Sequence, residues 1–397
     1  MRKRSIWILY SGYGNVGDEA ILWGTLNVFK NVIDAEKIKL IDVYPKMPKK
    51  LNSLSVEYIN MERLLGSKLS RVLRHTYSAF QLAFSCQRRK AELTGLLWHR
   101  GCSCYDSYHG SKLLVESIVY TSTVASRFLY RALGGLSMGF TRNCFERNIL
   151  KKFLSKWNLI LLREPYSLHY IQDLVPNKDK VLLVHDFAIH VNRSESERSK
   201  RIKEVLKCLK KGNLTSVILR DYYYQCHYPK LYRVRYFHFI KDLINTLTER
   251  GHEVVFIPLG YLGDRENDIR FYQELETRKV LKKGAHILAE VVTLTPSEVV
   301  DVLSIFDYVV SVRTHGLILA SIANVPTLHL YYEHKGKGIA EHTFGVESWS
   351  LYSCLREDGA AEKVVKYLEN MADKPIHKIL RARKYNEKIV REITLKN

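Results

Sequence analysis

Two residues in the C-terminal half of the chain are especially suited to chemistry. Arg313 and His315 lie two positions apart in a turn between a predicted strand, residues 307–312, and a predicted helix, residues 314–322. A guanidinium binds carboxylate or phosphate groups through paired hydrogen bonds, and an imidazole transfers protons near neutral pH. Parallel α/β sheets bind their ligands at the carboxyl ends of the strands. The turn therefore predicts a site that binds a small anion and transfers a proton.

Arg220 is a further candidate for the same site. It ends a predicted strand, residues 216–220, at the start of the same half of the chain. Because parallel strands end at one edge of a sheet, its side chain should emerge beside Arg313. Two guanidinium groups at one edge favour a ligand with two or three negative charges. The alternative is that Arg220 is a surface charge next to Asp221.

A glycine-rich turn near the N-terminus is a second place suited to ligand binding. Gly12, Gly14 and Gly17 lie between a predicted strand and a predicted helix. Glycines let the backbone approach a ligand closely, and the N–H groups at a helix start favour anions. The glycines also satisfy the bare spacing of a dinucleotide-binding loop, and Asp42 ends the next predicted strand. Spacing alone therefore leaves a nicotinamide cofactor open.

Composition limits the class of protein and the class of partner. A chain of 397 residues is long enough for two domains, and its 46% of hydrophobic residues can form buried cores. The net charge of +21 favours an anionic partner, whether a small molecule, a nucleic acid or an acidic membrane surface. The seven cysteines lack the paired spacing of a zinc site, so we predict no metal and expect a cytoplasmic location. No apolar run reaches the roughly 18 residues that cross a bilayer.

Strand and helix patterns alternate along both halves of the chain. The predicted strands are residues 5–10, 38–43, 159–162, 181–184, 216–220, 253–257, 307–312 and 327–331. The predicted helices are residues 166–174, 236–250 and 314–322, with one after the glycine-rich turn and one at the capping box Thr295–Glu298. Such alternation implies right-handed crossovers and parallel sheets. We therefore predict an α/β fold of two Rossmann-like domains whose parallel sheets face each other across a cleft that holds the active site.

The boundary between the domains is predicted from a polar segment. Residues 192–212 are dominated by Arg, Lys, Glu and Ser, with few apolar positions. Placing the boundary there gives an N-terminal domain of residues 1–200 and a C-terminal domain of residues 201–397.

Residues 66–90 interleave basic residues such as Arg71 and Arg74 with apolar ones such as Tyr77 and Phe80. A basic amphipathic helix would suit an anionic membrane surface, which would make the protein peripheral at the inner face of the membrane. The alternative is a helix packed on its own domain with solvated charges.

Motifs at both ends of the chain carry a family resemblance. Residues 12–22 and 313–326 resemble the two most specific motifs of the polysaccharide pyruvyl transferase family. Weaker motifs of that family are similar, in the same order, to residues 135–139, 162–167, 185–188 and 256–259. The resemblance implies a GT-B-like fold, with the acceptor side in residues 1–200 and the donor side in residues 201–397.

The resemblance also implies an activity. Members of that family transfer the pyruvyl group of phosphoenolpyruvate to sugar hydroxyls and form a cyclic ketal. It implies phosphoenolpyruvate as donor, a sugar or oligosaccharide acceptor that is free or lipid-linked, and no cofactor. Carried onto this chain, it implies that Arg220 and Arg313 hold the phosphate and carboxylate of the donor. His315 would be the general acid that protonates the methylene carbon.

The resemblance places the glycine-rich turn on the acceptor side of the cleft. The residues it implies there are Gly14, Asn15, Gly17 and Asp18. For Asp18 the alternative is that it only caps the following helix.

One segment departs from the family's pattern. Members commonly have three consecutive glycines before an acceptor-side loop, where this chain has residues 98–106 with Gly101 as their only glycine. Both a changed acceptor and a degenerate enzyme are compatible with that departure.

Two other functions stay open. A GT-B glycosyltransferase with a nucleotide-sugar donor would need an acidic residue for the ribose and a base-stacking pocket, and no clear pair is found. A non-catalytic polyanion-binding protein would use the interleaved aromatic and basic residues 222–235. The chain has no recognised nucleic-acid motif, so we predict no nucleic-acid partner.

Overall fold

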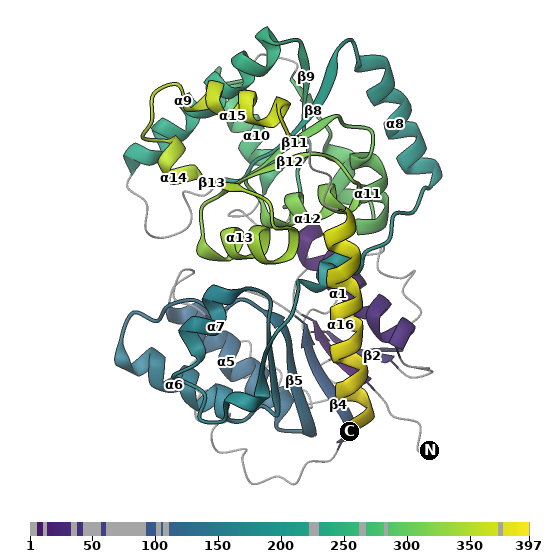
Figure 1. Ribbon diagram of the computed structural model, residues 1–397, viewed down its shortest axis with the longest axis vertical. Coiled ribbons are helices and arrows are strands. Elements are labelled where there is room, and N and C mark those ends of the chain that lie inside the picture. Colours follow the sequence, from purple (N-terminus) through teal and green to yellow (C-terminus); the bar gives the residue numbers. More distant parts are fainter. Residues whose placement is uncertain are drawn as a thin grey trace. The chain divides into compact units, whose positions relative to one another are not determined.

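The chain forms two compact α/β units in the computed structural model (Figure 1). The structure describes residues 6–10, 14–32, 38–42, 57–60, 93–100, 105, 111–221, 230–261, 267–281, 285–371 and 376–396. The first unit comprises Met1–Ser11, Thr25–Phe187 and Lys384–Asn397, and the second comprises Gly12–Gly24 and Ala188–Arg383. The residues of the glycine-rich turn therefore belong to the second unit.

The first unit contains a seven-stranded sheet in which every neighbouring pair is parallel. Across the sheet the strands are β3 (Glu57–Asn60), β2 (Ile38–Asp42), β1 (Ile6–Tyr10), β4 (Leu93–Arg100), β5 (Phe128–Leu136), β6 (Leu159–Leu162) and β7 (Val181–Leu183). Its helices are α1 (Val16–Val32, shared with the second unit), α5 (Ser111–Ala125), α6 (Cys144–Ser155) and α7 (Pro165–Ile171). Apolar side chains of β5, β6 and α6 form much of its core.

The second unit contains a six-stranded sheet, also parallel throughout. Across the sheet the strands are β10 (His286–Ile287), β9 (His252–Phe256), β8 (Asn213–Ile218), β11 (Tyr308–Ser311), β12 (Thr327–Tyr331) and β13 (Ser348–Ser350). Helices α9 (Lys230–Glu249), α10 (Asp268–Thr277) and α15 (Ala360–Glu369) cover one face; α8 (Glu197–Leu209), α11 (Pro296–Leu303) and α12 (Thr314–Ile322) cover the other (Figure 1). The remaining helices are α13 (His334–Ile339), α14 (Leu351–Cys354) and α16 (Ile376–Lys396), and α16 is divided between the units.

Local sequence signals placed several elements correctly. The predicted bounds of β6, α12 and β12 agree with the structure. The capping box is confirmed: the Thr295 side chain accepts from the Glu298 backbone, Glu298 returns a hydrogen bond, and Pro296 opens α11. The prediction that Asp18 caps the first helix is wrong. Asn15 takes that place, since its Oδ1 accepts from the Gly17 N–H at 2.8 Å and its carbonyl accepts from the Glu19 N–H.

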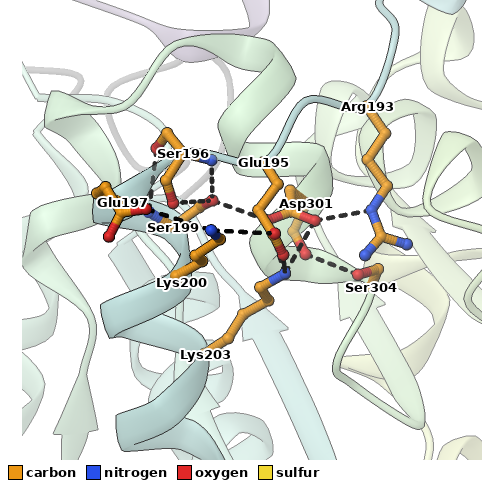
Figure 2. A network of polar contacts seen from close by, with 9 residues as sticks. All are labelled: Arg193, Glu195, Ser196, Glu197, Ser199, Lys200, Lys203, Asp301 and Ser304. Carbon is orange, nitrogen blue, oxygen red and sulfur yellow. Dashed lines mark hydrogen bonds and ion pairs between the residues drawn. The ribbon is translucent and has the colours of Figure 1, made fainter.

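Most of the polar segment at the predicted domain boundary is helix α8 of the second unit, and the chain re-enters that unit at Ala188. Its polar side chains converge on Asp301 of α11, which is fully buried (Figure 2). Arg193 and Lys203 form ion pairs with Asp301 at 2.7 and 2.8 Å, and Ser199 Oγ donates to it at 2.8 Å. Burial alone would raise the pKa of Asp301, but hydrogen bonds from Lys203, Ser199 and Arg193 outweigh it and lower that pKa. The sequence predicted a domain boundary in this segment because it has few apolar residues. Ion pairs to Asp301, rather than apolar contacts, attach much of it to the second unit.

Several predictions fall on residues that the structure does not describe. Residues 66–90, 101–104 and 222–229 lie outside the described residues, and with them the proposed amphipathic helix and much of the segment that departs from the family pattern. Of that segment, Trp98 is buried edge-to-face between Phe29 and Phe187, and Tyr105 is buried against Phe153. These two bulky residues are therefore part of the core. Among the described helices, none is both long and apolar enough to cross a membrane.

Candidate functional site

The strand register places Arg220 and Arg313 at the same edge of the second sheet. Strand β11 pairs with β8 so that Ser311 lies opposite Ile218, and the Val312 N–H donates to the Ile218 carbonyl at 2.8 Å. Each arginine follows two residues after this last pair. Arg313 is the N-cap residue of α12, and His315 is the second residue of that helix. The predicted neighbourhood of Arg220, Arg313 and His315 is thus present at the carboxyl edge of the sheet.

The guanidinium of Arg313 is held by a buried carboxylate. Its Nη2 donates to Oδ1 of Asp268, and the two side chains are 5% and 1% exposed. The other carboxylate oxygen accepts backbone N–H groups of Leu259 and Gly260 at 2.9 and 2.8 Å. Because Asp268 is fixed by the backbone, it fixes the direction of the Arg313 side chain.

Arg220 is a buried residue rather than a surface charge. Its Nη1 donates to the Tyr332 hydroxyl at 2.6 Å, and the guanidinium lies 5.4 Å from the centre of that ring. The neighbouring Asp221 instead forms an ion pair with Arg233 at 2.8 Å. The alternative interpretation of Arg220 from the sequence is therefore wrong.

Each of the two arginine side chains extends past the end of the strand next to its own. Arg313 follows β11 and reaches Asp268, which follows β9, so its side chain passes the end of β8. Arg220 follows β8 and reaches Tyr332, which follows β12, so its side chain passes the end of β11. Both guanidinium groups therefore lie at the carboxyl edge of the sheet, each held beyond the end of the strand next to its own.

The glycine-rich turn lies against His315. A Cβ placed on Gly17 would be only 2.3 Å from Nδ1 and 2.4 Å from Cγ of that imidazole. The family resemblance implies that this turn lies on the acceptor side, in the N-terminal domain. In the structure the turn belongs to the same unit as both arginines and contacts the predicted proton donor.

Backbone hydrogen bonds attach this turn to the loop after β9. The Val16 N–H donates to the Leu259 carbonyl and the Tyr261 N–H donates to the Gly14 carbonyl, both at 2.8 Å. Gly14 has a φ of 94°, a left-handed conformation that glycine adopts without strain. The Tyr261 hydroxyl donates to the fully buried Glu19. Burial, and then the charge of Glu19, raise the pKa of Tyr261, so this phenol stays protonated.

A second histidine supports the β11–α12 turn from within the sheet. His329 of β12 is fully buried, and its Nδ1 lies 2.8 Å from the Ser311 carbonyl, to which it donates. Burial lowers the pKa of His329 to about 4, so the ring is neutral at pH 7. Ser311 Oγ in turn donates to the Arg313 carbonyl at 2.7 Å. The backbone that carries Arg313 and His315 is therefore held by hydrogen bonds to its own strand and, through Ser311, to the next one.

Three of the four weaker motifs of the sequence meet in the first unit, whereas residues 256–259 belong to the second. Arg163 donates from Nη1 to Asp186 at 2.6 Å and from Nε to Ser137 at 2.7 Å, with all three side chains buried. Glu164 caps α7 by accepting the Ser167 N–H at 2.9 Å. These contacts join the segments 135–139, 162–167 and 185–188 into one buried network, which gives them a structural role in this unit.

Sequence reasoning missed four residues of this site. Asp268, Tyr332, His329 and Ser311 contact the candidate residues or their backbone. Ser311 is the last residue but one of the predicted strand 307–312, and Tyr332 directly follows the predicted strand 327–331, so their positions were a usable signal. For Asp268 the sequence contains no such signal. Its only distinguishing feature is that it is the first residue of α10.

Comparison with known proteins identifies the family. The family model described as polysaccharide pyruvyl transferase matches residues 15–334. This chain belongs to the polysaccharide pyruvyl transferase family. The matched residues include Gly17, Arg220, Arg313 and His315. A search of the curated proteins finds no significant sequence match.

Solved structures share the fold of this family member at low sequence identity. The UDP-GlcNAc 2-epimerase of Methanocaldococcus jannaschii is 11% identical with a TM-score of 0.57, covering 98% of this chain and 99% of that one. Anabaena Alr3699/HepE in complex with UDP-glucose is 11% identical with a TM-score of 0.53, covering 97% and 94%. A glycosyltransferase from Rickettsia africae is also 11% identical with a TM-score of 0.53, covering 100% and 98%. The predicted GT-B-like α/β fold is thus confirmed.

Proposed function

We propose that this protein transfers the pyruvyl group of phosphoenolpyruvate to two hydroxyls of one sugar in a polysaccharide or its precursor, forming a cyclic ketal. The observation that carries the proposal is that Arg220 and Arg313 each come two residues after the ends of adjacent parallel strands, with His315 on the same turn as Arg313. Family membership supports pyruvyl transfer to a saccharide. The donor and the roles of these three residues are our assignment.

Phosphoenolpyruvate fits the charge at this edge. It is a small trianion whose phosphate and carboxylate are attached to the same carbon atom, and guanidinium groups bind both through paired hydrogen bonds. In the proposal Arg220 and Arg313 hold these two groups. The first turn of α12 adds N–H groups that favour negative charge.

The transfer begins with proton donation by His315. The protonated imidazole gives its proton to the methylene carbon of phosphoenolpyruvate, while an acceptor hydroxyl oxygen bonds to the adjacent carbon. The bond from that carbon to the phosphate oxygen then breaks, and phosphate leaves with the electron pair. A second hydroxyl of the same sugar bonds to the carbon and closes the ketal. One hydroxyl proton ends on phosphate and the other restores the protonated imidazole.

The chain contributes orientation and fixed charge. Asp268 and Tyr332 hold the two guanidinium groups, so they need no reorganisation as charge builds on the departing phosphate. Placing the imidazole and the donor in one geometry removes much of the entropic barrier of the first step.

The test is solvent deuterium incorporation. The protein is incubated in D₂O with phosphoenolpyruvate and a panel of free and lipid-linked saccharides, and products are analysed by mass spectrometry. The proposal predicts one deuterium in each ketal methyl group, one phosphate released per ketal, and loss of both in His315→Gln. A ketal whose methyl group lacks solvent deuterium, or phosphate release unaffected by His315→Gln, would contradict it.

A further inference from the structure

The segment Gly14–Glu19 contacts the proton donor of the proposed function, since Gly17 lies directly against the imidazole of His315. We propose that this segment positions the imidazole of His315 for proton transfer. The imidazole packs directly against the backbone of Gly17. The hydrogen bond between Tyr261 and Glu19 fixes the position of the segment. That His315 donates the proton rests on the proposed function. The contact that positions its ring does not depend on which donor is bound.

Gly17 is glycine because of His315 and not because of its own backbone. It lies in the first turn of α1, where any residue can adopt the helical conformation. A Cβ there would nevertheless overlap the imidazole, at 2.3 Å from Nδ1 and 2.6 Å from the Cβ of His315. Contacts this short do not occur between real carbon and nitrogen atoms, so any side chain at this position displaces the ring.

The segment is anchored at three points. Two anchors are the hydrogen bonds of the Val16 N–H and the Gly14 carbonyl to the loop after β9, and together these two bonds make the antiparallel bridge between Asn15 and Gly260. The third anchor is the hydrogen bond from Tyr261 to the buried carboxylate of Glu19. A charge-assisted hydrogen bond in a buried setting is stronger than a neutral one, so this anchor resists rotation of the first turn.

The same loop also fixes Arg313. The N–H groups of Leu259 and Gly260 donate to Asp268, which pairs with Arg313, while the carbonyl of Leu259 binds the segment beneath His315. One short loop therefore sets the position of the imidazole relative to the guanidinium. Since a displacement of about 1 Å in a reacting group can cost about 100-fold in rate, this coupling matters for turnover rather than for binding.

The experiment uses Gly17→Ala in the full chain. We expect kcat to fall by about 30-fold or more while the Kd for phosphoenolpyruvate, measured by calorimetry, changes by less than about twofold. A second readout needs no turnover: the ¹³Cε1 signal of His315 in histidine-labelled protein, assigned with His315→Gln. Its chemical shift and its titration midpoint should both move in Gly17→Ala.

Two further variants separate positioning from general destabilisation. At Gly212, next to the amino end of β8, a Cβ would lie 2.2 Å from the Gly251 carbonyl oxygen, so Gly212→Ala introduces a comparable overlap at the opposite edge of the same sheet. We expect it to lower the melting temperature without moving the His315 signal or kcat. Tyr261→Phe removes one hydroxyl and should lower kcat by about fivefold, with the Kd retained.

The outcomes distinguish this inference from the proposed function. A wild-type His315 signal and an unchanged kcat in Gly17→Ala would overturn the inference. Equal loss of kcat in Gly212→Ala and Gly17→Ala at equal loss of stability would also overturn it. If the wild-type protein does not turn over phosphoenolpyruvate but Gly17→Ala still moves the His315 signal, positioning is supported and only the donor assignment falls.

Discussion

Arg313 and Asp268 form a buried ion pair in which the carboxylate is itself fixed by two backbone N–H groups. The pair cancels much of the charge that a buried guanidinium would otherwise carry alone, and it sets the direction of that guanidinium. Arg220 is held differently, because its Nη1 donates to the neutral hydroxyl of Tyr332. The two arginines are therefore expected to respond differently when their neighbours are changed.

Asp268→Asn should weaken donor binding through Arg313. The variant keeps a side-chain oxygen but loses the negative charge that orients the guanidinium. A charge-assisted hydrogen bond contributes about 1.5–3 kcal/mol, so the Kd for phosphoenolpyruvate should rise about tenfold or more by calorimetry. The control is Asp307→Asn, which removes a partly exposed carboxylate bound to Lys210 and to a backbone N–H near the start of β8. Equal Kd values for Asp268→Asn and wild type would exclude this role.

Arg220→Lys should weaken donor binding by removing the planar fork that holds two oxygen atoms. A lysine keeps the charge but acts as a point charge, so we expect a Kd about 10- to 100-fold higher. Tyr332→Phe keeps the ring and removes only the hydroxyl that accepts from Arg220. Its expected effect is smaller, about two- to fivefold. A larger effect of Tyr332→Phe than of Arg220→Lys would assign donor binding to the tyrosine instead.

His315→Gln should separate binding from chemistry. Loss of a general acid typically costs about 10²- to 10⁴-fold in kcat, whereas the Kd for phosphoenolpyruvate should change by less than about twofold. His238, exposed on α9, is the matched control, and His238→Gln should leave both quantities unchanged. Ketal formation by His315→Gln at the wild-type rate would remove this residue from the mechanism.

His329 should make the stability of the protein depend on pH. Its pKa is about 4 in the folded protein and 6.5 for an ordinary histidine, so between these values the unfolded chain binds a proton that the folded protein does not. Lowering the pH from 6.5 to 4 therefore lowers the free energy of unfolding, by up to roughly 3 kcal/mol from this residue. His329→Asn retains a donor for the Ser311 carbonyl and does not titrate. Urea denaturation at several pH values should show a smaller loss across this window in the variant.

Much of the fold follows from local sequence, and the limits of that reasoning are specific. The predicted bounds of β6, β12 and α12 agree with the structure, and Arg313 and His315 lie at the predicted start of α12. The helix α8 was missed because ion pairs to Asp301 replace apolar contacts along much of it. A pattern of apolar residues indicates which positions are buried. It does not indicate which charged side chains will form ion pairs.

The partners within the site were beyond sequence reasoning for a related reason. Gly17 and His315 come from opposite ends of the chain, and their contact exists only because the loop after β9 binds the glycine-rich turn. Asp268 reaches Arg313 across the end of another strand. The family resemblance gave the types of residue involved, while the tertiary fold decides which of them touch.

Donor binding by the purified wild-type protein is the most direct test of the account. The melting temperature is measured with phosphoenolpyruvate and, separately, with UDP-glucose, and each titration is repeated with Arg220→Lys. A ligand at about 100 times its Kd adds about 2.7 kcal/mol to the free energy of unfolding. The account predicts a rise with phosphoenolpyruvate that needs a higher concentration in Arg220→Lys, and none with UDP-glucose. A rise with UDP-glucose alone would contradict it and would make this family member a nucleotide-sugar enzyme.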